Sequence, residues 1–206
     1  MMEGNGALTA PDTGNPLKDA KNMPLHQLYT AIASRHSLGA KHQTAPAPSR
    51  AVLEKAVACA RRVPCHEKVL PVRYVLIESR DKLADLYQST LGPDADEAMI
   101  RRARDKATKS PGIVAVIETN RTPDMTPLME RERMMSLGAG FQNFLLALTA
   151  EGFVGKVVTG REFPDPMGLF DPETERLHAF IMVGTPDEPI AEEDVPAAEE
   201  PMLTTW

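Results

Sequence analysis

The stretch MSLGAGFQNFLLALTAEGFVGKVVTG, residues 135–160, combines a long helix pattern and a short strand in one continuous segment. Apolar side chains recur every three or four residues in its first part, which predicts a helix over residues 128–151. The apolar side of that helix holds Leu137, Phe141, Leu145 and Leu148. Met134 and Met135, near its start, are expected in the core. The sequence GKVVTG, residues 155–160, predicts a strand that runs into a turn.

Gly138 and Gly140 lie inside the predicted helix, where each glycine costs about 1 kcal/mol relative to alanine. We therefore expect another helix or a flat ligand to approach the backbone closely there. Gly152 and Gly155 bracket the turn between helix and strand, and backbone N–H groups exposed at such a turn can bind a carbonyl or an anion. An ordinary connection with glycines at a helix end explains the same spacing, so the turn alone defines no site.

Outward from this segment, helix and strand patterns alternate along the chain. Strands are predicted at 72–78, 112–118 and 178–184, and further helices at 25–34, 81–91, 95–109 and from a Ser49 cap to Pro64. The run GIVAVIE at 112–118 is continuously apolar, as expected of a strand that is buried on both faces. Strands interleaved with helices in this way indicate an α+β or α/β sandwich.

The composition is that of an ordinary globular protein of 206 residues, with 42% hydrophobic and 25% charged residues. A formal net charge of −6 argues against a dedicated nucleic-acid binder, which normally carries a basic excess. No apolar run reaches the roughly 18 residues of a membrane-spanning helix, and the first residues lack a signal-peptide pattern. The two cysteines give no disulfide framework, so a cytoplasmic protein with no membrane or nucleic-acid partner is expected.

Three regions are predicted along the chain. Residues 1–24 are rich in glycine, proline and asparagine, which is typical of a loose N-terminal arm. Residues 25–188 hold all the predicted helices and strands and are expected to form one domain. Residues 189–206 form an acidic extension, because the chain from Asp187 onward holds seven acids and no base.

The first candidate for chemistry is Arg35-His36-Ser37, at the end of the predicted helix 25–34. Arginine binds phosphate through two parallel hydrogen bonds, and the imidazole and hydroxyl groups add further donors. A solvated helix end, with cations near the negative end of the helix dipole, explains the same three residues. Both interpretations stay open on these residues alone.

A second candidate is RRVPCHEK, residues 61–68, where an apolar helix stops and a strand is about to begin. Cys65 and His66 are adjacent, but neighbouring ligands in one loop rarely make a closed metal site, and no second pair has suitable spacing. A catalytic thiol is disfavoured because it needs an oriented base. We favour an arrangement in which Arg62 and His66 face a ligand at the edge of the sheet.

Taken in order, these segments resemble the FMN-dependent nitroreductase family, and in particular its short members. The segments are SRHS after the first helix, RRVPCHEKVLPVRYVLIE after the second, the stretch 135–160, and HAFIMVGTPDE near the end. The resemblance spans residues 25–188. The ordered set of segments is more specific than any one of them.

The resemblance implies an α+β fold with a central, mostly antiparallel sheet flanked by helices, assembled as an intertwined homodimer. It implies FMN as cofactor at sites shared between the subunits, and NAD(P)H as co-substrate. The implied activity is reduction of a nitroaromatic, a quinone or a related small electron acceptor by hydride transfer through the flavin. Because the cofactor carries this chemistry, no catalytic side chain and no metal are expected.

The cofactor-binding residues that the resemblance implies come from three segments. They are Arg35, His36, Ser37, Arg62, His66, Val157, Val158 and Thr159. The first three are expected at the FMN phosphate and ribityl chain, the next two in a second contact loop, and the last three along the flavin ring. The helix that holds Gly138 and Gly140 is expected at the centre of the dimer.

Four positions depart from the family pattern. His36 stands where a second arginine is usual, and Val157 stands where a tryptophan is frequent. Leu70-Pro71-Val72 replaces a QPW sequence, and the segment after Gly184-Thr185-Pro186 is acidic where many relatives carry a cation. These changes remove positive charge and aromatic surface from the expected site. The alternative is therefore a flavin-poor relative that keeps the fold as a dimeric binding or regulatory protein.

Overall fold

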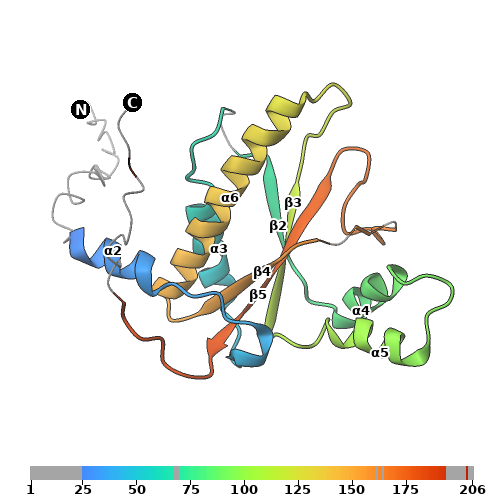
Figure 1. Ribbon diagram of the computed structural model, residues 1–206, viewed down its shortest axis with the longest axis horizontal. Coiled ribbons are helices and arrows are strands. Elements are labelled where there is room, and N and C mark those ends of the chain that lie inside the picture. The colour runs from blue at the N-terminus through green and yellow to red at the C-terminus, as the bar shows by residue number, and fades with distance from the viewer. Residues whose placement is uncertain (1–24, 67–69, 161, 164, 194–202, 204–206) are drawn as a thin grey trace, which may run out of the picture.

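The computed structural model describes residues 25–66, 70–160, 162–163, 165–193 and 203. In this part of the chain a five-stranded antiparallel sheet lies at the centre, with helices against both of its faces (Figure 1). The fold is therefore α+β with a central antiparallel sheet flanked by helices, as predicted.

The helices and strands follow one another along the chain with the following bounds. They are α2 (Leu25–Ser34), η2 (Ala40–His42), β1 (Gln43–Thr44), α3 (Arg50–Ala60), β2 (Val72–Leu76), α4 (Arg80–Ser89), α5 (Glu97–Asp105), β3 (Gly112–Glu118), α6 (Pro127–Ala150), β4 (Val154–Val158) and β5 (Arg176–Pro186). Every predicted helix and strand is present, and among the described residues the short η2 and β1 are the elements that were not predicted.

Some predicted boundaries are wrong. The helix α3 ends at Ala60, so Pro64 is not the residue that ends it. The helix α5 is shorter than the predicted 95–109 at both ends. The strand β4 ends at Val158, and the predicted turn follows at Gly160, whose φ of +86° lies outside the range of a β-strand.

Four helices begin with a side chain that caps a free backbone N–H group. The capping residues are Ser49, Ser79, Asp96 and Thr126, which accept from the backbone N–H of Val52, Lys82, Met99 and Met129. Pro127 follows Thr126 as the first residue of α6, where its missing N–H is not needed. The cap at Ser49 was predicted from the sequence and is confirmed.

The strand β5 is the centre of the sheet, because it pairs with β3, β4 and β1. The strand β3 lies between β5 and β2, and all seven of its residues are buried. This confirms the prediction that the apolar run 112–118 is covered on both faces. Two hydrophobic cores cover it, because successive side chains of a strand point to opposite faces.

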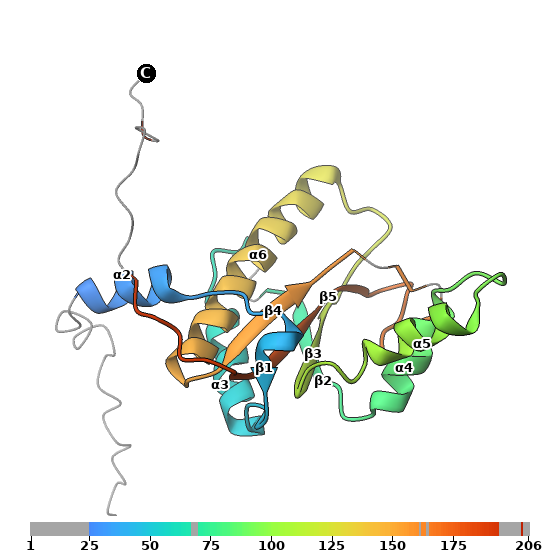
Figure 2. The same cartoon turned by 60° about the horizontal axis from the view of Figure 1, so that its bottom comes forward.

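Each face of the sheet has its own core. On one face, α3 and α6 pack against Val114, Val116 and Ile181. On the other face, α4 and α5 pack against Ile113, Ala115 and Phe180. The long α6 and the α4–α5 pair lie on different sides of the sheet, as Figures 1 and 2 show together.

The packing of α6 confirms one part of the prediction and corrects another. Leu137, Leu145 and Leu148 are buried as predicted, whereas Met134 and Met135 are 49% and 71% exposed and so do not lie in the core. Both lie in the first half of α6, where their side chains stay accessible to solvent. On α2, Leu28 and Ile32 are likewise exposed.

The two glycines of α6 also differ from each other. A Cβ atom at Gly140 would lie 3.1 Å from the backbone oxygen of Ala60, so α3 approaches closely there, as expected. A Cβ atom at Gly138 would meet no atom within 4 Å. Packing of α3 on α6 therefore explains the glycine at position 140, whereas no contact in the described residues explains the glycine at position 138.

The ends of the described chain meet at one side of the molecule. The helix α2 lies beside the C-terminal end of α6, and the segment 187–193 runs past it (Figure 2). The predicted arm, residues 1–24, lies outside the described residues, as does most of the predicted extension 189–206. Of the helices that the structure describes, none has the length and apolarity needed to cross a membrane.

Candidate cofactor-binding site

The segment that follows α2 lies against the start of β4. Ser37 forms an isolated parallel bridge with Gly155, although the two residues are far apart in the sequence. Gly155 itself packs tightly on α6, since a Cβ atom there would come within 2.6 Å of Leu145 Cδ2. The glycine in the helix-to-strand turn thus lets β4 lie close to α6, and Arg35-His36-Ser37 is fixed at the beginning of that strand.

Arg35 keeps most of its hydrogen-bonding capacity. Its Nη1 donates to Ser37 Oγ over 3.2 Å, and its buried Nε has no hydrogen-bond partner in the part of the chain that the structure describes. No carboxylate of the described residues forms an ion pair with Arg35. An arginine with unused, partly buried donors next to a serine hydroxyl suits an anion such as phosphate.

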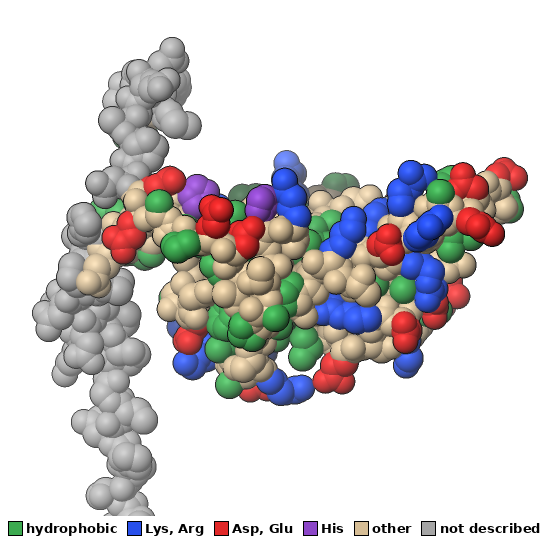
Figure 3. Space-filling view, turned by 90° about the horizontal axis from the view of Figure 1, so that it is seen from below, with side chains coloured by type: hydrophobic (Ala, Val, Ile, Leu, Met, Phe, Trp, Pro, Cys, Tyr) green, Lys and Arg blue, Asp and Glu red, His purple; other side chains and the backbone are tan. Residues whose placement is uncertain are grey.

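His36, in contrast, has an acidic partner from the C-terminal segment. Its Nε2 lies 3.2 Å from Glu193 Oε1, and the backbone N–H of Glu193 donates to Ser34 Oγ over 2.7 Å. A second pair joins His42 Nδ1 to Asp187 Oδ2 at 3.0 Å. Histidine and acidic side chains accordingly lie close together on the surface shown in Figure 3.

A hollow of about 210 Å³ lies at the other end of β4. Its wall is mainly apolar and aromatic, with three polar side chains. The residues that line it are Tyr87, Lys106, Val158, Thr159, Gly160, Phe163, Leu177, His178, Ala179, Phe180 and Met182. Because a strand rises about 3.3 Å per residue, the hollow begins roughly 10 Å along β4 from the Ser37–Gly155 bridge.

The three predicted strand residues divide between the two faces of the sheet. Val158 and Thr159 line the hollow, whereas Val157 packs against the core formed with α3 and α6. The alternation of side chains along a strand explains this division. Lys106 and His178 line the hollow too, and the sequence analysis did not identify them, since they come from elements distant from β4.

His178 is held in place from behind by Glu118. The register between β3 and β5 shifts so that Val116 pairs with Ala179 and Ile117 pairs with Leu177, which leaves His178 as the extra residue of a β-bulge. Its Nε2 lies 2.7 Å from Glu118 Oε2. The bulge therefore places this imidazole between the hollow and a buried carboxylate.

Glu118 also accepts hydrogen bonds from two arginines, Arg121 at 2.9 Å and Arg133 at 3.1 Å. Burial by itself would raise the pKa of this carboxyl group, but the hydrogen bonds from His178, Arg133 and Arg121 lower it to about 2. Glu118 is consequently ionised at neutral pH and is fully occupied by its partners. It supports His178 but offers no free acid or base.

The second predicted loop lies along the first half of α6. His66 Nε2 is 3.3 Å from Glu132 Oε1, and Ser136 Oγ donates to the backbone oxygen of Pro64 over 2.8 Å. Arg62 is exposed, and its backbone oxygen accepts from Asn143 Nδ2. His66 lines a shallow hollow of about 520 Å³ together with Cys65 and Met135, separate from the hollow at β4.

The two predicted groups of residues lie apart within one chain. Ser34 lines a hollow with Thr149 at the end of α6, whereas Pro64 is bonded to Ser136 more than three turns earlier. At 1.5 Å per residue these positions are roughly 20 Å apart along the helix axis. The structure thus brings Arg35, Ser37, Val158 and Thr159 to one strand and leaves Arg62 and His66 elsewhere.

The site holds no arrangement typical of metal or thiol chemistry. In the part of the chain that the structure describes, no group of three or more histidine, cysteine or acidic side chains is placed to bind a metal ion. Cys59 and Cys65 are both free thiols, on and just after α3. The chemically distinctive feature is instead a strand with anion donors at one end and an apolar hollow at the other.

Comparison with known proteins defines the class to which this fold and site belong. The sequence model of the "Nitroreductase family" matches residues 32–185. The chain therefore belongs to the nitroreductase family, as the resemblance predicted. It is 30% identical over 153 residues to a Haemophilus influenzae protein named "Putative NAD(P)H nitroreductase", a match that covers 70% of this chain and 82% of that protein.

Solved structures agree on the fold. The nitroreductase-like family protein from Bacillus cereus superposes with a TM-score of 0.67 at 21% identity, covering 81% of this chain and 90% of that one. The NADPH:FMN oxidoreductase from Vibrio harveyi, solved in complex with NAD+, superposes with a TM-score of 0.60 at 16% identity, covering 85% of this chain and 77% of that one. At these identities the likeness concerns the fold alone.

Proposed function

We propose that this chain is an FMN-dependent NAD(P)H oxidoreductase that reduces nitroaromatic, quinone or related small acceptors. Membership of the nitroreductase family supports an oxidoreductase. The name of the Haemophilus influenzae relative and the Vibrio harveyi complex point to NAD(P)H and FMN as the reductant and cofactor. The proposed compartment is the cytoplasm.

The observation that carries the proposal is the arrangement along β4. Arg35, with a buried and unpartnered Nε, and the Ser37 hydroxyl lie at the start of the strand, and an apolar hollow lies past its end. FMN has the matching shape, because it is a planar apolar ring joined by a chain to a phosphate. In the proposal Arg35 and Ser37 bind the phosphate end, and Val158 and Thr159 lie along the ring. Of the other residues that the resemblance implied, Val157 faces the core on the other side of the sheet and His36 is paired with Glu193.

In this proposal the protein groups would bind and orient FMN, and the bound flavin would supply the two-electron redox chemistry between NAD(P)H and the acceptor. The aromatic and aliphatic wall of the hollow excludes water from a planar ring. Lys106 and His178 stand at the same wall, and Glu118 fixes the orientation of the imidazole. No side chain of the chain has to change its covalent bonding.

A homodimer completes the proposal. Most of the exposed large apolar residues that the structure describes lie on α2 and on the first half of α6, which fits a surface that a second chain covers. They are Leu28, Tyr29, Ile32, Leu128, Met129, Met134 and Met135. Gly138, with open space around it, lies on the same helix. A second chain would also bring Arg62 and His66 of one subunit to the flavin of the other.

The test is direct. The purified protein is expected to be yellow, or to turn yellow with added FMN, and to gain thermal stability as FMN is raised above its dissociation constant. Anaerobic absorbance measurements with NADH and NADPH should bleach the flavin band, and a panel of nitroaromatics and quinones should restore it. Light scattering should give the mass of a dimer, about twice 22.5 kDa.

The alternative function, a flavin-poor dimeric binding or regulatory protein on the same fold, predicts different results. Two observations favour it. Val157 stands where an aromatic residue is usual, and the side chain of Glu193 is paired with the imidazole of His36. A colourless dimer whose thermal stability does not respond to FMN would support this alternative and contradict the oxidoreductase.

A further inference from the structure

One lysine near the proposed phosphate end is not part of the expected cofactor-binding set. Lys156 follows Gly155, the residue that forms the bridge with Ser37, and its side chain is exposed. Its Nζ lies 3.9 Å from the position that a Cβ atom at Gly39 would take. The ammonium group thus reaches from β4 to the loop that carries Arg35 and Ser37.

Lys156 also stands on the face of the sheet that carries the hollow. It pairs with Met182 across the strands, and Met182 lines the hollow. Val158, two residues further along β4, lines the hollow as well, and residues two apart in a strand share a face. Lys156 therefore lies between the anion donors and the hollow, along the path that a ligand spanning both would follow.

Near Lys156, some cationic or basic side chains have an acidic partner and others have none. His36 and His42 each have a carboxylate partner, Glu193 and Asp187. Arg35 and Lys156 form no ion pair with any acid in the described residues. An anion that enters here consequently finds two uncompensated cations, one from the loop and one from β4, while the imidazole of His36 is already engaged.

We propose that Lys156 is a further anion-binding residue of this site and supplies the second cation for the ligand's phosphate group. The proposal rests on the proposed flavin function. It explains how a chain with histidine at position 36 keeps two positive charges at the phosphate: the second charge comes from the neighbouring strand rather than from the loop.

The test separates the phosphate from the ring by comparing FMN with riboflavin, which lacks the phosphate. Lys156→Gln is expected to weaken FMN binding about tenfold, the size of a charge-assisted hydrogen bond, and to leave riboflavin binding unchanged. Lys156→Arg keeps the charge and should stay within about threefold of the unaltered protein. Lys109→Gln, which removes the same charge from an exposed position after α5, serves as the matched control and should change neither affinity.

Two outcomes overturn the proposal. If Lys156→Gln binds FMN as tightly as the unaltered protein, the lysine does not bind the phosphate. If it weakens FMN and riboflavin equally, the lysine acts on the ring or on the strand. If the unaltered protein binds neither FMN nor riboflavin, the proposed function itself is wrong, and the role of Lys156 with it. Failure of the Lys156 proposal alone leaves flavin binding by the unaltered protein intact, so the two failures are distinguishable.

Discussion

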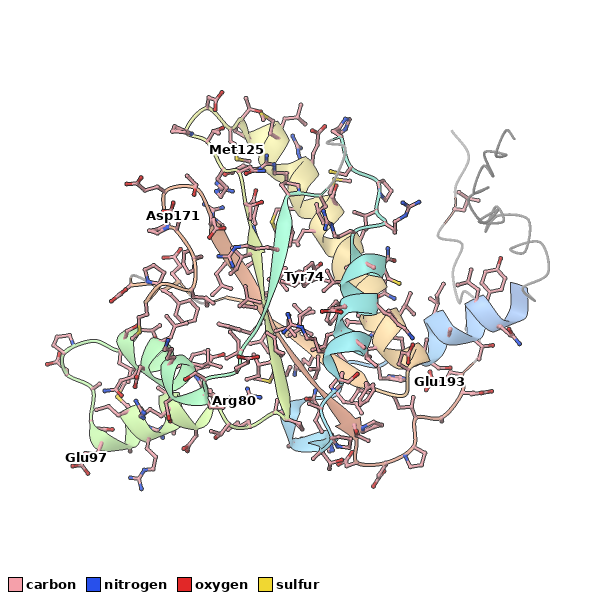
Figure 4. The ribbon with its side chains drawn as sticks, turned by 180° about the vertical axis from the view of Figure 1, so that it is seen from behind. Tyr74, Arg80, Glu97, Met125, Asp171 and Glu193 are labelled. Atoms are coloured by element: carbon pink, nitrogen blue, oxygen red, sulfur yellow. The ribbon has the colours of Figure 1, made fainter. Side chains whose placement is uncertain are left out.

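Two charged clusters of this molecule differ in how completely their charges are matched. At the end of β3 the Glu118 carboxylate, only 5% exposed, meets His178, Arg121 and Arg133. At the start of β4, Arg35 and Lys156 have no acidic partner among the described residues. Met125, which lies beside Arg133, and Glu193, which lies beside His36, mark the two clusters in Figure 4, where they lie well apart.

The difference separates a structural cluster from a binding cluster. A buried carboxylate has to be paired because removing an ion from water is costly, and the cluster at Glu118 meets that requirement within the chain. Cations without an acidic partner remain available to an anionic ligand. The comparison therefore predicts that changes at Glu118 act mainly on stability and changes at Arg35 mainly on binding.

The largest effect is expected from Glu118→Gln. The change leaves Arg121, Arg133 and His178 without their shared negative charge in a buried setting, so the free energy of unfolding should fall by about 3–5 kcal/mol. Urea denaturation measures it. Glu130→Gln is the matched control, because Glu130 also pairs with Arg121 but is 43% exposed, and the loss of stability should be much smaller. If both variants lost the same free energy of unfolding, the burial of Glu118 among its three partners would have no particular effect on stability.

Protonation of Glu118 in acid should destabilise the protein less than Glu118→Gln does. A protonated carboxyl group still accepts a hydrogen bond. The pKa of Glu118 lies at about 2 in the folded protein against an ordinary 4.5, so its stabilising contribution is complete above pH 4.5. As the pH falls from 4.5 through 2, that contribution is lost. The stability difference between the unaltered protein and Glu118→Gln, measured by urea denaturation at each pH, should shrink over this range. A constant difference would contradict the lowered pKa.

At the open cluster, Arg35→Ala should weaken FMN binding by roughly 1.5–3 kcal/mol, the contribution of a charge-assisted contact. The free energy of unfolding should change by less than about 0.5 kcal/mol, because the hydrogen bond that Arg35 makes among the described residues goes to the exposed Ser37 side chain. Flavin titration and urea denaturation measure the two quantities. Arg50→Ala, on the exposed start of α3, is the control for a lost positive charge. If Arg35→Ala binds FMN as tightly as the unaltered protein, Arg35-His36-Ser37 is only the solvated end of α2 and does not bind the phosphate.

The smallest effect is expected at the two glycines of α6. Gly140 packs closely against α3, whereas Gly138 has open space beside it. Gly138→Ala should raise the free energy of unfolding by up to about 1 kcal/mol, since alanine favours a helix and nothing in the chain obstructs it. Gly140→Ala should lower it by about 1 kcal/mol, because the backbone of Ala60 has to move. If Gly138→Ala instead weakens the dimer in a sedimentation experiment, a second chain packs on that position.

Much of the fold was predictable because its signals are local. The apolar run at 112–118 predicted a strand that is covered on both faces, and Ser49 predicted the start of α3. The prediction that Met134 and Met135 lie in the core was wrong, because periodicity along a helix does not reveal whether another element covers that part of the helix. In the candidate site, Arg35, Ser37, Val158 and Thr159 were predicted from the family resemblance, and the structure places them along one strand.

The sequence by itself determined the order of helices and strands and the family, because periodicity, caps and ordered motifs are properties of neighbouring residues. Only the tertiary structure decided which charges meet. Glu118 and His178 are 60 positions apart, and His36 and Glu193 are 157 positions apart. Lys156 reads in the sequence as an ordinary strand residue until the Ser37–Gly155 bridge brings it beside Gly39. Such contacts depend on how the strands pair across the sheet, which no local pattern encodes.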